Sequence, residues 1–429
     1  MLDRFYQLFT SLKLTFVLLC LAAVLVFLGT MAQDPLGLYL VQERFFKSLF
    51  VDSASMVAAV KKTLQMAHVY LPPTTAADVM AAPYFPVFPG GYLLGTLLVV
   101  NLGLAHLRYY RTTWRKAGII LIHLGILVML VGQLATDLFQ VESHLRLAEG
   151  ETKNYSESGL ANELVIIDTT APDQDHVMWF SERRVAREPE LRHPSLPFTV
   201  RVRTYHRNAT PRVAPTTAPQ DSAVRGVGQR LGFEGRPPVT RLDARDVPAA
   251  LVEILDGPAS LGRWWVSNWL VEESLVEMLR QEVGAAIRPL LGAPQTFQFK
   301  GRTYQLALRP ARYYKPFSLQ LLQFSHDKYP GTEIPKNFSS RVRVLRPEAG
   351  EDREVLIYMN NPLRYAGETF YQASFAPDND QRVNKVTVLQ VVRNPGRLTP
   401  YLGCLLVAAG MTFQFLLHLA GYLKQGRTG

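Results

Sequence analysis

The sequence predicts a membrane protein of mixed α+β class: four transmembrane helices and a large β-rich, antiparallel, sandwich-like domain between spans 3 and 4. Three observations predict this fold. Four apolar windows each have about the 20 residues that cross a bilayer as a helix. A domain-sized block before the last window alternates between apolar and polar residues. The mean hydropathy over 429 residues is +0.03, as expected when an apolar part and a polar part are averaged.

The four predicted spans are residues 14–32, 91–107, 118–138 and 398–423. The first resembles a secretory signal peptide because Arg4 and Lys13 precede it. Its apolar stretch is longer than the core of about 7–15 residues that signal peptides have. Because further spans follow, we interpret it as a retained helix.

Basic residues collect at one set of span ends, and such ends face the cytoplasm. They are Arg4, Lys13, Arg108, Arg111, Arg115, Lys116, Lys424 and Arg427. This pattern predicts cytoplasmic segments at residues 1–13, 108–117 and 424–429, with both termini inside. Residues 33–90 and 139–397 are then extracytoplasmic. The flanks account for part of the net charge of +10, so this charge is weak evidence for nucleic acid, and no nucleic-acid partner is expected.

The short outer segment, residues 33–90, is expected to contain an amphipathic helix around residues 41–66. Five prolines between residues 72 and 89 predict an extended approach to the second span, because proline stops helices.

The large outer block, residues 139–397, shows the two-residue alternation of half-buried antiparallel strands, for example at residues 198–205 and 341–345. We expect a sandwich or a barrel-like arrangement. A helical insert is predicted over residues 271–291. The polar, proline-rich interval at residues 208–240 is predicted to be a mobile loop, and its role is left open.

The outer block contains no recognisable catalytic motif: no glycine-rich phosphate loop, HExxH or GxSxG occurs. We therefore expect no catalytic residue there and a binding or scaffolding role. Trp264, Trp265 and Trp269 are interpreted as core or interface aromatics. The chain has two cysteines, Cys20 and Cys404, both within apolar runs, which excludes a disulfide framework or a CxxC redox motif.

Three histidines lie in the apolar windows: His106, His123 and His418. Counted from the basic flanks at about 1.5 Å per residue, all three fall within roughly 11 Å of the cytoplasmic ends. Neutral imidazole can ligate haem iron, and ionisable groups in a bilayer usually face the bundle interior. His123 is the leading candidate, although an interhelical hydrogen bond explains it equally well. His106 and His418 are weaker candidates, because they can simply reach the interface. No other metal site is expected.

Gly118, Gly125 and Gly132 recur every seven residues, so they share one helix face and allow close helix packing. His123 is rotated by about 200° from Gly125 and addresses another neighbour. We expect this neighbour to be another protein chain or a haem. The alternative is a polar contact inside the chain's own bundle.

At several places, in order, the chain resembles one family. The matching segments are Ser11–Thr15, Leu28–Thr30, Arg115–Gly125, Gly132, Tyr329–Thr332, Pro335–Lys336, Ser340, Met359–Leu363, Gly367, Phe370–Phe375 and Val391–Gly396. The family that they resemble is the ResB (CcsB-type) family of cytochrome c biogenesis.

This resemblance implies a role in a bacterial plasma (inner) membrane, beside a CcsA (ResC)-like multi-span partner. The pair, known as system II, would export haem and join it to the CxxCH cysteines of apocytochrome c. A histidine of the ResB-like subunit helps hold haem in the membrane, and His123 matches its motif position. The expected cofactor is therefore haem b, bound transiently as substrate.

The tryptophan-rich haem motif of the partner is not found in this chain, so the resemblance implies one subunit of the synthase. Whether this subunit is non-catalytic or co-catalytic stays open. Two other functions remain as alternatives: a membrane-anchored sensor or receptor with an outer β-domain, and a haem-bearing anchor of a respiratory complex, which requires paired histidines at matching depths.

Overall fold

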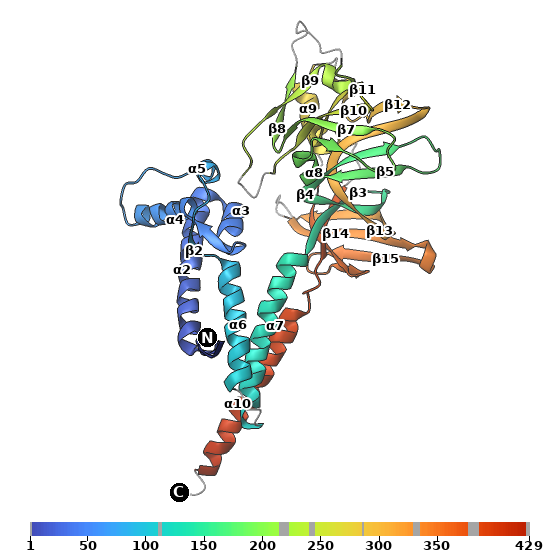
Figure 1. Cartoon of the computed structure of the whole chain (residues 1–429). Helices are drawn as coiled ribbons and strands as arrows, with labels where there is room; N and C mark the ends of the chain where they lie inside the picture. Colours follow the sequence, from blue (N-terminus) through green and yellow to red (C-terminus); the bar gives the residue numbers. More distant parts are fainter. Residues whose placement is uncertain are drawn as a thin grey trace. The chain divides into compact units, whose positions relative to one another are not determined.

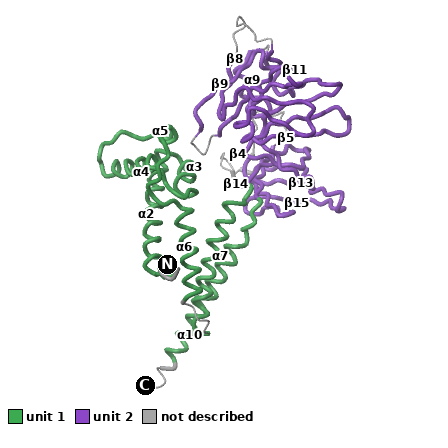
Figure 2. The backbone as a smooth tube through the Cα atoms, in the orientation of Figure 1, with its two compact units in different colours: residues 1–141, 240–244, 393–429 green, residues 142–239, 245–392 purple. Residues whose placement is uncertain are grey.

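The computed structural model describes the chain in seven stretches: residues 2–109, 114–213, 223–239, 245–284, 287–328, 335–375 and 386–425. The fold divides into two compact units, coloured separately in Figure 2. The membrane unit comprises residues 1–141, 240–244 and 393–429, and the β unit comprises residues 142–239 and 245–392.

Four helices of the membrane unit are long and apolar enough to cross a bilayer, among the residues that the structure describes. They are α2 (Leu12–Leu36), α6 (Gly91–Tyr109), α7 (Ala117–Phe139) and α10 (Thr399–Gln425), all labelled in Figure 1. Two short elements accompany them, α1 (Leu2–Phe9) and η2 (Trp114–Lys116). The prediction of four membrane helices is confirmed, and the chain is a multi-pass membrane protein.

Helices α7 and α10 pack at backbone distance through the three evenly spaced glycines. A Cβ added at Gly118 would lie 2.7 Å from the carbonyl oxygen of Gly410. One added at Gly125 would lie 2.6 Å from that of Gly403, and all three glycines of α7 are buried. Close helix approach along this face, predicted from the spacing, is confirmed.

The start of α2 is tied to α6 by the buried side chain of Asn101, which is 1% exposed. Its amide nitrogen donates to the carbonyl oxygen of Phe9 at 2.8 Å, and the Thr15 hydroxyl donates to its Oδ1 at 2.5 Å. A buried amide is costly without hydrogen bonds, so these bonds fix how α1, α2 and α6 meet.

The outer segment of the membrane unit contains several short elements. They are α3 (Leu38–Val41), the π-helical turn η1 (Gln42–Phe46), β1 (Phe50–Asp52), α4 (Ser53–Met66), α5 (Ala76–Ala81) and β2 (Pro86–Pro89). The expectation of one amphipathic helix around residues 41–66 is wrong. Strand β1 interrupts it because it pairs with β2, and Asp52 then begins a new helix by accepting from the backbone N–H of Ser55 at 3.0 Å.

The β unit is built from one ten-stranded and one four-stranded antiparallel sheet and a hairpin of β8 and β9. The larger sheet has the order β15-β14-β13-β4-β3-β18-β17-β16, with β12 beside β13 and β5 beside β4, and the smaller has the order β11-β10-β7-β6. The strands are β3 (Val141–Ala148), β4 (Thr152–Asp168), β5 (His176–Ser181), β6 (Glu190–Leu191), β7 (Thr199–His206), β8 (Ala209–Val213), β9 (Leu231–Gly235), β10 (Ala249–Asp256), β11 (Ala259–Ser267), β12 (Gln295–Phe299), β13 (Arg302–Lys328), β14 (Pro335–Arg346), β15 (Glu351–Tyr358), β16 (Leu363–Tyr365), β17 (Glu368–Phe375) and β18 (Val386–Arg393).

One half of the β unit is a sandwich, as predicted. Its core combines side chains of the ten-stranded sheet, such as Phe180 and Tyr304, with Val200, Ile254 and Trp264 of the four-stranded sheet. These side chains are 0–2% exposed. The apolar residues that alternate along the sequence therefore lie on one buried face of each sheet.

The other half of the ten-stranded sheet curls on itself in a barrel-like manner. Ser340 on β14 and Gln372 on β17 stand far apart in the strand order, yet the hydroxyl of Ser340 lies 2.6 Å from Oε1 of Gln372. The same hydroxyl lies 2.8 Å from Oγ1 of Thr387 on β18. A second core, which includes Phe317 and Phe370, fills this half.

Two sequence expectations for the β unit need correction. The described parts of residues 208–240 form β8, β9 and the turn η3 (Gly226–Gln229), so this interval is largely a hairpin rather than a mobile loop, with residues 214–222 and 240 outside the described stretches. The predicted helical insert is shorter: α9 (Glu273–Glu282) ends before Gly284, and Pro289 lies in a separate turn, η5 (Arg288–Leu290). Helix α8 (Glu182–Arg187), η4 (Asn268–Leu270) and η6 (Pro347–Ala349) complete the unit.

Candidate functional site

The structure brings together two of the three histidines that the sequence singled out. His106, near the end of α6, and His123, in the first third of α7, have ring centroids 5.0 Å apart, with their planes inclined by 54°. The two helices follow one another in the chain and run in opposite directions, so both rings lie toward the helix ends that the short link joins.

His123 has a defined orientation, set by its own helix. Its Nδ1 lies 2.8 Å from the carbonyl oxygen of Ile119, one turn earlier. A carbonyl oxygen only accepts, so Nδ1 must donate, and Nε2 is then the unprotonated nitrogen of the neutral ring. Metal-bound histidines typically donate their second ring N–H to such a group, which fixes ring and tautomer. His123 is thus prepared to ligate through Nε2.

The imidazole of His106 is partly buried, and both of its ring nitrogens are shielded from solvent. His106 lies three residues before the last residue of α6, and His123 lies six residues after the first residue of α7. At about 1.5 Å per residue, both rings are less than about 10 Å from the helix ends that the link joins. This agrees with the shared depth inferred from the sequence.

His418 does not join this pair. It is exposed on α10, and the side-chain amide of Gln414, one turn earlier, donates to its Nε2 at 3.2 Å. The neighbour of His123 that the structure shows is His106 of the same bundle. This is the contact within the chain's own bundle that the sequence left open, and the expectation of a second chain or a haem beside His123 stays a prediction.

The glycines of α6 differ from those of α7. No described atom lies within 4 Å of a Cβ added at Gly95 or Gly103, whereas Gly118, Gly125 and Gly132 contact α10. Gly103 precedes His106 by three residues, which is one turn of the helix. A methyl side chain at Gly103 would therefore contact none of the described neighbours of α6.

A polar cluster lies at the opposite end of α6 and α7, and the sequence pattern did not predict it. Lys47 Nζ lies 2.9 Å from Oδ1 of Asp137, and the hydroxyl of Tyr92 donates to the same carboxylate. The hydrogen bond and charge of Asp137 raise the pKa of Lys47 above its usual value, against a smaller opposing effect of burial. In the sequence, the signal for this cluster is Asp137, an acidic residue at the end of an apolar run. The cluster fastens the outer segment to both helices.

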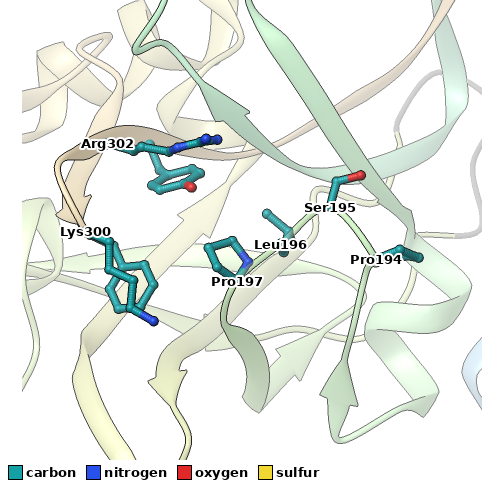
Figure 3. Close-up of a pocket in the computed structure, with 8 residues that line it drawn as sticks. Pro194, Ser195, Leu196, Pro197, Lys300 and Arg302 are labelled. Carbon is teal, nitrogen blue, oxygen red and sulfur yellow. The ribbon is translucent and has the colours of Figure 1, made fainter.

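The β unit contains a shallow hollow lined by residues 194–197 and by Phe299, Lys300, Arg302 and Tyr304 (Figure 3). Its volume is about 330 Å³. Arg302 is already paired with Asp168 at 3.1 Å, and Lys300 lies over the ring of Phe299. Across the described residues of both units, no group of three or more His, Cys, Asp or Glu is placed to hold a metal ion. Both cations beside this hollow are therefore engaged with neighbouring side chains.

The tryptophans of the β unit are core residues, as interpreted from the sequence. Trp264 is 2% exposed within the sandwich. Trp265 and Trp269 pack against a separate core beside α9, and Nε1 of Trp269 donates to the carbonyl oxygen of Ala209 at 2.9 Å.

Comparison with known proteins identifies one part of the β unit. Residues 295–384 match the ResB-like family. This segment of the chain is ResB-like. Protein NrfI of Wolinella succinogenes is 35% identical over 111 residues, which is 26% of this chain and 12% of NrfI. The chain thus matches about an eighth of the length of that relative. The family resemblance inferred from the sequence is confirmed.

The ResB-like segment begins at β12 and includes β13 to β17. Several residues of its motifs hold the fold together. Asn360 and Gly367 adopt positive φ angles of 63° and 81° in the turns around β16, a conformation that these two residue types tolerate. Ser340 and Gln372 form the buried contact that closes the curled half of the sheet. The residues of the motif Tyr329–Thr332 lie outside the described stretches.

Proposed function

We propose that this chain is a subunit of a cytochrome c biogenesis complex that helps deliver haem across the membrane for covalent attachment to apocytochrome c. The observation that carries the proposal is the ResB-like match over residues 295–384, in a chain with four membrane helices. In this proposal haem b is cargo, held briefly in the membrane unit and then passed on.

His123 is the proposed axial ligand of this haem. Its Nδ1–H is held by Ile119, so Nε2 presents its lone pair, which is the form of imidazole that binds iron. Its depth, near the basic flanks, fits a haem that enters from the cytoplasmic side.

The proposed orientation puts both termini in the cytoplasm and the β unit outside a bacterial plasma membrane, because the basic residues flank the corresponding span ends. The proposed partner is a CcsA (ResC)-like multi-span protein. Cys20 and Cys404 lie in membrane helices α2 and α10, so they are poorly placed to handle the thiols of an apocytochrome. Thioether formation is assigned mainly to the partner, and this chain has a supporting role.

The test is complementation of a deletion strain, with holocytochrome c detected by its covalently bound haem. The wild-type chain should restore maturation, whereas His123→Ala should lose most of it while its membrane level stays equal. Normal maturation in the deletion strain would contradict the function, and normal maturation with His123→Ala would contradict the ligand role.

A haem-bearing anchor of a respiratory complex is a second candidate, favoured by the paired rings of His106 and His123. The two functions differ in whether the bound haem takes part in catalytic redox turnover. The anchor should show quinol-dependent reduction of its haem at catalytic rates, and a cargo site should not.

A further inference from the structure

We propose that helix α4 of the outer segment lies in the plane of the lipid interface, with an apolar stripe of Val57, Val60 and Leu64 in contact with the bilayer. The occupant of this surface is the lipid itself, at the headgroup and acyl boundary on the side of the membrane away from the basic flanks. The inference concerns only the outer segment of the membrane unit, so it is independent of haem and of the proposed function.

One face of α4 is both apolar and exposed. Val57, Val60 and Leu64 follow one another at intervals of three and four residues, so their side chains lie on a single face of the helix. They are 40–48% exposed. Ala58 and Ala59, on the other side of the helix, are buried in the core that α4 shares with α2. A surface helix in water normally presents polar side chains outward, and α4 has the reverse arrangement.

The ends of the neighbouring spans mark the depth of the hydrocarbon boundary. Residues 14–33 of α2 and 117–136 of α7 contain no Asp, Glu, Lys or Arg. Each run has about 20 residues, which is the length that crosses a hydrocarbon core of about 30 Å as a helix. Asp34 and Asp137 directly follow these two runs, so both carboxylates stand at the boundary.

Two ion pairs hold the outer segment at this boundary. Nζ of Lys62, in α4, lies 2.6 Å from Oδ2 of Asp34, and Nζ of Lys47 lies 2.9 Å from Oδ1 of Asp137. Lys62 belongs to α4 itself, and α4 runs across the end of α2 rather than along it (Figure 1). The helix therefore lies at about the level of Asp34, which is the level of the headgroups.

Packing next to the ion pairs gives the same depth. A Cβ added at Gly29 of α2 would lie 2.6 Å from Cζ of Phe46, so the ring of Phe46 rests directly against α2. Gly29 precedes Asp34 by five residues, which is about 7.5 Å along a helix axis. The outer segment thus reaches the last turns of the span and does not stand clear of the membrane.

The other side chains of the segment fit lipid better than water. Tyr70, Tyr84 and Phe85 are each more than half exposed. Aromatic residues with polar tips collect at membrane interfaces, where the ring meets apolar chains and the hydroxyl meets water. Helix α4 carries Lys61 and Lys62 and no acidic residue, and lysines beside an apolar stripe can reach lipid phosphates. An interfacial helix of this kind keeps the bundle at one depth, because raising it exposes the stripe and lowering it buries Lys61.

The experiment uses the full chain in nanodiscs of phosphatidylethanolamine and phosphatidylglycerol, with Cys20→Ala and Cys404→Ala. A nitroxide spin label is attached to one new cysteine at a time. Electron paramagnetic resonance then compares its collisions with oxygen, which is enriched in lipid, and with a nickel chelate, which stays in water. Three valines of similar exposure, 38–44%, form a matched series: Val60→Cys on the stripe, Val24→Cys in the middle of α2 and Val177→Cys on β5 of the β unit.

The label at Val60→Cys should report a position about 5–10 Å into the headgroup and acyl boundary. The label at Val24→Cys should lie deeper, and that at Val177→Cys should behave as in water. Collision with the nickel chelate at Val60→Cys as frequent as at Val177→Cys would overturn the inference. Protection from both reagents would mean that a protein surface covers the stripe, which also overturns it.

A second pair of labels tests whether α4 lies in the plane of the membrane. Val57→Cys and Leu64→Cys stand at opposite ends of the stripe, seven residues apart. In a helix parallel to the surface they should report the same depth. A difference of about 10 Å, the rise of seven residues along a helix that stands upright, would contradict the proposed orientation. Because the substituted side chains are exposed, the labels should leave the core of the membrane unit intact.

Discussion

The two units of this protein place their polar groups in opposite ways. In the β unit, the buried polar side chains bond to one another: Arg309 pairs with Glu163 at 3.0 Å, and Ser340 lies against Gln372 and Thr387. In the membrane unit, two imidazoles of adjacent helices face each other, and one of them is set in a single tautomer by its own helix. The β unit therefore uses its polar residues for folding, whereas the paired imidazoles of the membrane unit include the ligand that we propose for haem.

The same contrast separates the ResB-like segment from the candidate ligands. The match covers β-unit residues whose described roles are structural, whereas the candidate ligands lie outside residues 295–384. A recognisable family segment can thus identify the scaffold, and the chemistry has to be sought in the geometry of another part of the chain.

The largest expected effect on stability comes from the buried ion pair of the β unit. Glu163→Gln leaves the charge of Arg309 buried without its counter-charge, and removing one partner of such a pair costs about 3–5 kcal/mol. Thermal unfolding, followed by tryptophan fluorescence, should shift strongly downward, and the haem spectrum of the intact membrane unit should not change.

The control for this prediction is Glu354→Gln. Its partner Arg341 lies 3.9 Å away, and both side chains are more than half exposed, so the loss should stay below about 1 kcal/mol. Similar losses in the two variants would mean that the buried pair has no special role in the β unit.

A smaller effect on stability is expected from a substitution in the membrane unit. Gly125→Ala places a Cβ 2.6 Å from the carbonyl oxygen of Gly403 and must push α7 and α10 apart, at a cost of about 1–3 kcal/mol. Gly95→Ala, in open surroundings, should be tolerated. We would measure the resistance of each variant to unfolding in mixed detergent. If Gly125→Ala is as stable as Gly95→Ala, the close contact of α7 with α10 is wrong.

The smallest effect is a pH dependence of the β unit. Burial opposes the charge of Glu253, but hydrogen bonds from Ser260, Arg203 and Arg263 outweigh it and lower the pKa of this carboxyl. A lowered pKa in the folded state stabilises the protein above the unfolded value of about 4.3, and this stability is lost as the pH falls through the folded value.

The β unit should therefore lose stability below about pH 4, and Glu253→Gln should flatten this part of the profile. Unfolding in urea between pH 3 and 6, at about 1-unit steps, measures it. An unchanged slope in the variant would show that other carboxyls control the acid limit.

The sequence predicted the parts of the fold that depend on local pattern. Runs of apolar residues located four helices, and the spacing of Gly118, Gly125 and Gly132 located the face that meets α10. The helix expected at residues 41–66 failed because β1 pairs with β2, whose residues lie more than 30 positions away. Propensity within a window carries no information about such a partner.

For the candidate site, the sequence predicted how deep the histidines lie in the membrane but not which of them are neighbours. Counting residues placed His106, His123 and His418 in one layer, but depth does not say which helices are neighbours or how each is rotated. Packing brought His106 to His123 and left His418 exposed. The pair of Arg309 and Glu163, which lie 146 positions apart, was equally out of reach of pattern analysis.

The central claim, that the membrane unit holds haem through His123, is tested most directly by the haem content of the purified chain. Haem per chain should fall to background in His123→Ala, and should stay at the wild-type level in His418→Ala, a histidine of similar depth outside the pair. Equal loss in both variants, or full haem in His123→Ala, would contradict the account.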